Sequence, residues 1–448
     1  MSTNSAVRTA VVFVHGLLER RPMDTFDTFA RTVLAPDVDY HAQPLEITDS
    51  YEARRYLAPS VGAELFEYDW SFLMTSSRYA GFVPALARVF LRRPRHVPDQ
   101  LFGIWRLAWI AFAAPVALLA ALIVVGGFLL HTGVAGWIVG VVSSVVVLTV
   151  GIGVLRTAPR VLTRTFLTTG FVNVARYLDP APESHAARRA IRGGLVDLLS
   201  TLHQGRFARI VVVGHGIGGY IAYDALSTLW AELFELRSET SDTGEPAENL
   251  EAAADFQAAQ FARWQDLRRQ GNPWRTTDFV TVGTPMALAD LFVARPPIAA
   301  GLARSDSRHD LFDRLIGRGV VVTCPPGSEE ALDGLSPFAV TRWTNIWFPV
   351  RRGSIRGDWF GGVLRPLFGP GIREIAVTGN RPERLRPGTA QTKYFTHPER
   401  DAEGDVAFHL REALALADRA GLDASRTAPP PDPATVDRVV HRSWQRSM

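Results

Sequence analysis

The sequence has very little cysteine and lysine. Cys324 is the only cysteine among 448 residues, so no disulfide can form within one copy of the chain, and nothing indicates an oxidising compartment. Lys393 is the only lysine, and the other basic residues are arginines spread along the chain without a clustered run. This distribution does not favour nucleic acid as a partner.

The sequence also lacks the usual metal motifs. It contains no H-E-x-x-H, no C-x-x-C and no clustered aspartate pattern, so we expect neither a metal site nor a cofactor. The first nine residues are polar and have no apolar core, so a cleaved signal peptide is not expected either.

One long segment lacks charge altogether. From Leu107 to Leu155 the chain has 49 residues without Asp, Glu, Lys or Arg. One crossing of a bilayer takes about 20 apolar residues, so the segment predicts two spans, about Leu107–Leu130 and Val134–Leu155. The alternative is a pair of buried core helices. The segment is flanked by Arg92, Arg93, Arg95 and Arg106 on one side and by Arg156, Arg160 and Arg164 on the other. By the positive-inside rule, this protein would be a two-span protein of the cytoplasmic membrane with both ends in the cytosol.

Outside this segment, short apolar runs alternate with amphipathic stretches. This order predicts an α/β fold, with a mostly parallel sheet flanked by helices and the membrane hairpin inserted into it. The expected strands are 11–14, 64–70, 209–213, 279–282, 342–350 and 372–377, and the expected helices lie in 17–34, 184–204, 217–236 and 406–420. Residues 1–90 would begin the domain, 91–165 would form the insertion, 166–420 would complete the domain, and 421–448 would be a disordered tail. The polar stretch 238–251 is expected to be a loop.

The most informative segment is 210–220, which reads IVVVGHGIGGY. A β-branched run predicts a buried strand, and a glycine-rich turn then leads into a helix. This layout resembles the nucleophile elbow of lipase/esterase-type α/β-hydrolases, G-x-S-x-G followed by a further glycine. Gly214 and Gly218 fill the two glycine positions, Gly219 is the further glycine, and Gly216 stands where the family has serine. Glycine has no side chain and cannot act as a nucleophile.

The resemblance includes an early turn. His15-Gly16-Leu17 is similar to the turn whose backbone N–H helps to form the oxyanion hole in this family, and the second donor follows the nucleophile position, here Ile217. The resemblance therefore implies that backbone donors survive at a ligand-binding site. Its residues would be His15, Gly16, Leu17, His215 and Ile217.

The other two triad positions are changed as well. The family order is Ser, then Asp or Glu, then His. Aligning Ile355, Gly357 and Asp358 with the lipase-like pattern D-P-I-x-G-D places Gly353 at the acid. Aligning 390–395 with H-T-x-Y-[W/F] places Gln391 at the histidine. The resemblance thus implies a triad that is vacated at all three positions.

Three functions stay open on the sequence. The first is an inactive, membrane-anchored hydrolase-like protein that binds a lipid-like or acyl ligand or scaffolds a protein partner. The second is an active lipase or esterase with a relocated nucleophile or an activated water, using His397 as base and Asp358 as acid. The third is nucleotide binding through Gly214-x-Gly216-x-x-Gly219, which also satisfies G-x-G-x-x-G.

Overall fold

The chain is an α/β protein built on one eight-stranded sheet. The computed structural model describes residues 9–16, 22–74, 90–129, 182–235, 253–293, 308–324, 336–377, 390–400 and 402–416, together with residues 141, 142, 145, 149, 174 and 177. The strand order is β2-β3-β4-β1-β5-β6-β7-β8. The predicted α/β fold with a mostly parallel sheet flanked by helices is therefore confirmed.

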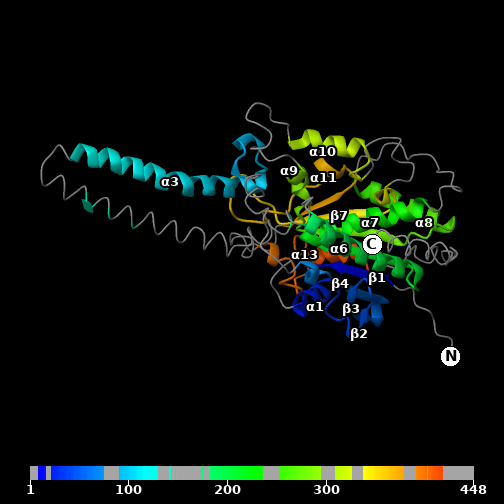
Figure 1. The fold of residues 1–448 in the computed structure, drawn as a ribbon. Helices are drawn as coiled ribbons and strands as arrows, with labels where there is room; N and C mark the ends of the chain where they lie inside the picture. The colour runs from blue at the N-terminus through cyan, green and yellow to red at the C-terminus, as the bar shows by residue number, and fades with distance from the viewer. Residues whose placement is uncertain are drawn as a thin grey trace.

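Strands β4, β1, β5, β6, β7 and β8 pair with one another in parallel, and at one edge of the sheet β3 runs in the opposite direction (Figure 1). The antiparallel pairings join β2 to β3 and β3 to β4. The strands are β1 Thr9–Val14, β2 His41–Ile47, β3 Glu52–Ala58, β4 Ala63–Asp69, β5 Arg209–His215, β6 Thr276–Val282, β7 Arg342–Trp347 and β8 Arg373–Ala376.

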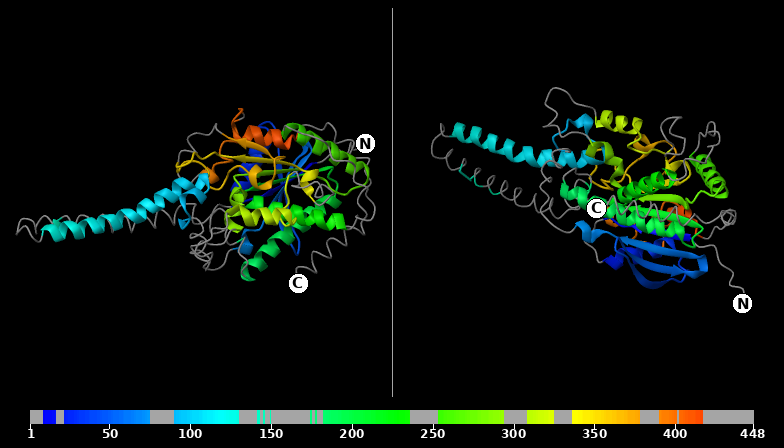
Figure 2. Two further views of the ribbon diagram at one scale, coloured as in Figure 1. Left: turned by 90° about the horizontal axis from the view of Figure 1, so that it is seen from above. Right: turned by 45° about the vertical axis from the view of Figure 1, so that its right-hand side comes forward.

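Helices cover both faces of the sheet, as Figure 2 shows. Successive side chains of a strand point to opposite faces. In β1, Ala10, Val12 and Val14 accordingly enter one core, and Val11 and Phe13 enter the other. Residues of α6 (Pro182–Gln204), α7 (Ile217–Glu235) and α8 (Ala253–Arg269) pack in the first core, and residues of α1 (Pro22–Val33) and α13 (Val406–Leu414) pack in the second.

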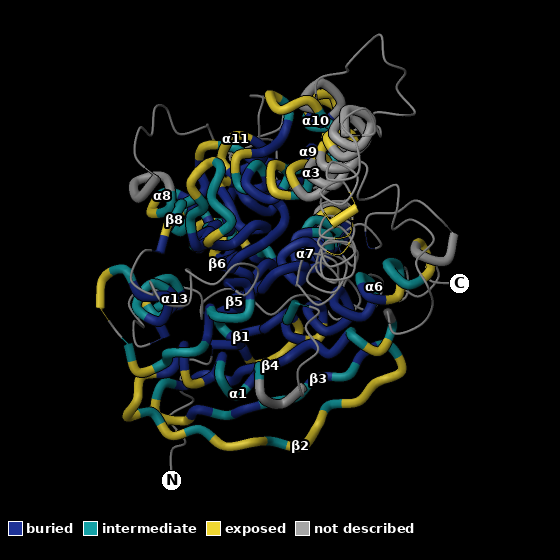
Figure 3. The backbone as a smooth tube through the Cα atoms, turned by 90° about the vertical axis from the view of Figure 1, so that its left-hand side faces the viewer, coloured by how far each residue is buried: buried dark blue, intermediate teal, exposed yellow. Residues whose placement is uncertain are grey.

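The sequence missed the antiparallel edge. β2 and β3 were not expected, because β2 is largely exposed and β3 carries Arg54 and Arg55 side by side, which hides the apolar alternation. Figure 3 shows this contrast between exposed β2 and the buried central strands. The helices α8 and α10 (Arg308–Gly317) were also missed. The expected loop at 238–251 and the tail 421–448 lie outside the described residues.

The expected membrane hairpin is not supported by the structure. Helix α3, Asp99–Leu129, covers most of the first expected span and projects from the body (Figure 1). Among the residues that the structure describes, no helix is long and apolar enough to cross a membrane. In α3, the described side chains run without a gap only from Asp99 to Ile110. Most of the second span, Val134–Leu155, lies outside the described residues.

The base of α3 is fixed to the loop that follows β7. A Cβ atom on Gly103 would lie 2.1 Å from the carbonyl oxygen of Ser354, so only glycine permits this approach. Arg106 Nη2 donates to the Gly353 carbonyl oxygen at 3.3 Å, and Arg352 forms an ion pair with Asp99. The helix is therefore docked at the carboxyl edge of the sheet, where β7 ends.

We predict that Gly103→Ala destabilises the fold by about 1–3 kcal/mol, because the added methyl group forces the 353–354 backbone away from α3. Gly317→Ala is the control, since Gly317 ends α10 and a Cβ there meets nothing within 4 Å. That variant should be neutral or stabilised by up to about 1 kcal/mol through helix propensity. Thermal unfolding measures both, and equal stabilisation of the two variants would refute the close contact.

Candidate functional site

The candidate site lies at the carboxyl ends of β1 and β5. After β1 the chain forms β2, β3 and β4, which lie on one side of β1, and it then forms β5, which lies on the other side of β1. The strand order therefore reverses between β1 and β5. Crevices at such reversals are the usual ligand sites of parallel sheets. Here Gly16 follows β1 and Gly216 follows β5, and a Cβ atom on Gly216 would lie 3.6 Å from the Gly16 Cα.

Gly216 forms a sharp turn between β5 and α7. Its φ is 55°, in the left-handed region that glycine adopts without strain. Its N–H donates to the Val282 carbonyl oxygen at 2.9 Å, and its own carbonyl accepts from the N–H of Gly219 at 3.1 Å. The turn is therefore sharp and hydrogen-bonded, and it carries no side chain at its centre.

The other glycines of the elbow allow very close packing. A Cβ atom on Gly218 would lie 2.0 Å from the Val14 carbonyl oxygen, and one on Gly219 would lie 2.5 Å from Thr284 Oγ1. A Cβ on Gly214 would lie 2.5 Å from the Cα of Gly219. Any side chain at these positions would clash. Because glycine has none, the first turn of α7 can pack directly on the end of β1.

Gln391 contacts the elbow directly. It lies in the short 3-10 helix Ala390–Thr392 and is buried. Its Nε2 is 2.9 Å from the point where a Gly216 Cβ would be, and it donates to the Gly283 carbonyl oxygen at 2.6 Å. Its Oε1 is buried and has no hydrogen-bond partner among the described residues. The amide therefore occupies the space in front of the nucleophile position.

His215 supports this arrangement from the elbow itself. Its Nε2–H donates to the backbone carbonyl oxygen of Gln391 at 3.0 Å, and its ring packs edge-on against Phe395, with 5.1 Å between the ring centroids. The imidazole is buried. It therefore holds the Gln391 backbone rather than pointing toward the space beside Gly216.

His15 belongs to a charged network between β1, β3 and β4. Its Nδ1–H donates to the Gly16 carbonyl oxygen at 3.0 Å, and its Nε2 lies 3.7 Å from Asp69 Oδ1. Burial by itself would lower the pKa of His15, but the contact with Asp69 and the negative charge of Glu67 raise that pKa overall. Arg54 binds both carboxylates, at 2.9 Å to Glu67 and 2.8 Å to Asp69. The carboxylates of β4 therefore stabilise the protonated form of the His15 imidazole.

Asp358 is buried beside Gly283, whose carbonyl oxygen accepts the hydrogen bond from Gln391. A Cβ atom on Gly283 would lie 2.8 Å from Asp358 Oδ2. The Tyr394 hydroxyl donates to Oδ2 at 2.7 Å, and the Phe360 N–H donates to Oδ1 at 3.0 Å. Burial raises the pKa of this carboxyl to about 6, although these hydrogen bonds oppose the rise. Asp358 is thus the carboxyl group nearest to Gly283, and its hydrogen bonds tie it to Tyr394.

The structure does not bring every expected residue to the elbow. Gly353 lies at the base of α3, where a Cβ atom would meet only Arg106, at 3.8 Å. His397 is paired with Glu399, with 3.0 Å between Nδ1 and Oε1, and 28% of its side chain is exposed. Leu17 lies outside the described residues. The elbow thus gathers Gly16, Gly216 and Gln391, whereas Gly353 is part of the α3 contact.

The sequence analysis did not name four residues that the structure places at the site. Gly283 and Tyr394 contact Asp358, and Trp70 Nε1 donates to the His15 carbonyl oxygen at 3.0 Å while Asp69 faces the imidazole. Gly283 follows a buried strand, and Asp69 and Trp70 end or follow one. Their positions at the ends of strands could have identified these three residues, because the carboxyl ends of parallel strands lie at the same edge of the sheet.

The backbone of the elbow can still bind a polar group. Ile217 is the first residue of α7, and N–H groups in the first helical turn lack intrahelical acceptors and carry a partial positive charge. This set suits a carbonyl or carboxylate oxygen. Where the structure describes the chain, no group of three or more His, Cys, Asp or Glu is arranged to hold a metal ion.

We predict that Gly216→Ala destabilises the protein more than Gly319→Ala does. Both glycines have a positive φ, 55° and 67°, so both variants lose about 1–2 kcal/mol to left-handed strain. A Cβ at Gly319 meets nothing within 4 Å, whereas one at Gly216 displaces the Gln391 amide from Gly283. The excess for Gly216→Ala should be about 1 kcal/mol or more in chemical denaturation.

A double-mutant cycle isolates the contact. In a Gln391→Ala background the added methyl group at Gly216 has no amide to displace, so the excess over Gly319→Ala should disappear. An excess that persists unchanged in this background would show that Gln391 is not the neighbour responsible.

We predict that Asp358→Asn removes a pH dependence of stability. Because the carboxyl pKa is about 6 in the fold and near 3.8 in the unfolded chain, the native form loses stability as pH rises from about 4 to 6. Asparagine does not ionise, so the stability of the variant relative to wild type should rise by on the order of 2–3 kcal/mol between pH 4 and pH 7. Denaturation at both pH values measures this, and a constant difference would mean that the buried carboxyl does not titrate in this range.

Comparison of the whole chain with protein-family models, with curated proteins and with solved structures finds no match in any of the three.

Proposed function

We propose that this chain is a non-catalytic, α/β-hydrolase-like protein of the membrane that binds a lipid-like or acyl ligand at the carboxyl edge of its sheet. The observation that carries the proposal is the amide of Gln391, whose Nε2 is 2.9 Å from the position of a Gly216 Cβ. An amide cannot take a proton from a nucleophile, and Gly216 offers no nucleophile. Gln391 and Gly216 therefore form a packed contact at the two positions where an active hydrolase would have its base and its nucleophile.

The ligand class follows from the donors and acceptors at the elbow. The N–H groups of the α7 N-terminus favour a carbonyl or carboxylate oxygen, and Gln391 Oε1 is a buried acceptor without a described partner. An unpaired buried acceptor costs about 1–3 kcal/mol, so a ligand hydroxyl at this point would be favoured. An acyl compound that also carries a hydroxyl group combines both features.

Membrane attachment rests on the sequence of residues 107–155 and on exposed apolar side chains. Leu107, Ile110, Val142 and Val145 are each more than half exposed, at 52, 55, 57 and 57%. Large apolar side chains at such exposure suit a lipid environment better than water. The charge-free segment is long enough for two crossings, and its arginine flanks favour a cytosolic position for the body.

The rival functions find less support in the geometry. An active hydrolase using His397 would need that imidazole beside a nucleophile, but His397 pairs with Glu399. Dinucleotide binding needs an acid at the end of the strand after the glycine-rich turn. Here β6 ends at Val282, and Gly283 and Thr284 follow it.

We predict that the purified full chain forms no adduct with a fluorophosphonate, a reagent that tags activated serines. Intact mass spectrometry beside a labelled serine hydrolase measures this. A stoichiometric adduct on the native chain would overturn the non-catalytic proposal, because it would reveal a working serine elsewhere.

The variant Gly216→Ser/Gln391→His tests the hydrolase-like geometry. It restores a nucleophile and a base, and native Asp358 is the available carboxyl near Gly283, so slow labelling of Ser at 216 is expected. Gly216→Ser alone is the matched control and should stay unlabelled, because it lacks the base. A folded double variant that also stays unlabelled would count against the family resemblance.

A further inference from the structure

Two segments lie against the base of α3, one just before the helix in the sequence and one far after it. Together with the base of the helix, we call them the α3 collar: residues 90–95, residues 99–110 of α3, and residues 351–356 of the loop after β7. Trp105 and Trp109 both donate from Nε1 to the Phe90 carbonyl oxygen, at 3.2 and 2.9 Å, which fixes the first segment to the helix. The contacts of Gly103 and Arg106 with residues 353–354 fix the third.

The α3 collar is strongly basic. Its segments contain seven arginines and one acidic residue, Asp99. Asp99 pairs with Arg352, whose guanidinium also lies 4.6 Å from the centroid of the Phe102 ring. The exposed arginines Arg93, Arg95, Arg351 and Arg356 form no ion pair with any described carboxylate. These four arginines therefore carry positive charge that no described carboxylate pairs with.

The α3 collar also contains exposed apolar and aromatic side chains. Leu107, Trp109 and Ile110 are 52, 38 and 55% exposed, and Leu91 is 46% exposed. Tryptophans gather where hydrocarbon meets the headgroups, and arginines gather beside the phosphates. On α3, Arg106 is followed at once by exposed Leu107, Trp109 and Ile110, and the other collar arginines lie on the two segments packed at the start of this helix. Charge at the base of the helix followed by exposed apolar side chains suits the boundary between headgroups and hydrocarbon.

We propose that the α3 collar binds the headgroups of anionic phospholipids and holds the carboxyl edge of the sheet against the membrane. The inference rests on the proposed membrane attachment and adds a lipid class and a set of arginines to it. It does not depend on whether the elbow binds a ligand. The chemistry recognised is a phosphodiester with a net negative headgroup, which a zwitterionic lipid does not offer.

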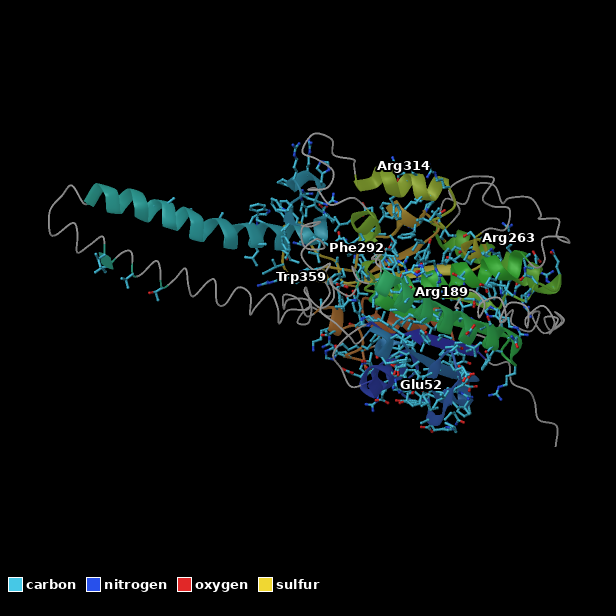
Figure 4. All side chains as sticks on the ribbon, viewed as in Figure 1. Glu52, Arg189, Arg263, Phe292, Arg314 and Trp359 are labelled. Atoms are coloured by element: carbon cyan, nitrogen blue, oxygen red, sulfur yellow. The ribbon has the colours of Figure 1, made fainter. Side chains whose placement is uncertain are left out.

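The test compares lipid binding by the full chain and two charge variants in detergent. An equimolar mixture of phosphatidylglycerol and phosphatidylcholine is added, and native mass spectrometry counts the bound lipids. The collar variant is Arg93→Gln/Arg95→Gln/Arg351→Gln/Arg356→Gln. The matched control removes four arginines from α1, α6 and α8, which lie on the body: Arg31→Gln/Arg189→Gln/Arg263→Gln/Arg269→Gln. Figure 4 labels two of these, Arg189 and Arg263, away from the point where α3 leaves the body.

Wild type and the control should bind more phosphatidylglycerol than phosphatidylcholine. In the collar variant, the ratio of bound phosphatidylglycerol to bound phosphatidylcholine should be lower by at least about tenfold. A variant with lysine at the same four positions should retain the wild-type ratio, which also shows that substitution there leaves the fold intact. No preference in wild type, an equal loss in the control, or a loss in the folded lysine variant would each overturn the proposal.

Failure of the membrane attachment itself gives a different result. Carbonate washing of membranes that contain the full chain is done first. Release of wild type into the wash would contradict the attachment on which the inference rests. Retention without preference for phosphatidylglycerol would contradict the collar alone.

Discussion

The close approach of α7 to β1 is the constraint on which the candidate site depends. Gly218 brings the helix so near to β1 that a Cβ would lie 2.0 Å from the Val14 carbonyl oxygen. This approach requires the chain to reverse within one residue after β5, and Gly216 does so at a φ of 55°. In an enzyme with this turn, a nucleophile would hold that strained conformation at a cost of about 1–3 kcal/mol. Glycine removes the strain and leaves the backbone donors in place.

Once Gly216 lacks a side chain, the space before it must be filled. The Gln391 amide fills it and joins the elbow to the end of β6 through the Gly283 carbonyl oxygen. His215 strengthens the same link by donating to the Gln391 backbone. These contacts connect the segments after β5, β6 and β8 through one buried side chain. Of the two polar atoms of the Gln391 side chain, Oε1 is the one without a partner among the described residues.

The sequence predicted those parts of the fold whose signals are local. β5 is buried on both faces and contains the apolar run 210–213, β6 ends in the largely apolar stretch 279–282, and the glycines of the turn lie within six residues, 214–219. The edge strands β2 and β3 escaped because exposed or charged positions break the alternation.

Site residues that depend on contacts across the sheet were harder to predict. Gln391 was named from a short pattern after the last strand, but that pattern does not show that its amide lies against Gly216, 175 positions earlier in the chain. Asp69 faces His15 from the neighbouring strand β4, and nothing in the local sequence indicates that pairing. Gly353 was inferred from one spacing, which could not reveal that the 353–354 backbone packs on Gly103 of α3.

That packing links the proposed membrane contact to the candidate site. Ser354 touches Gly103 of α3, and Asp358, four residues later, lies beside Gly283. Four residues span at most about 14 Å, so the base of α3 and the buried carboxyl cannot be far apart. If headgroups bind at the α3 collar, the carboxyl edge of the sheet lies close to the bilayer surface. An acyl ligand could then pass between lipid and elbow over a short distance, without crossing bulk water.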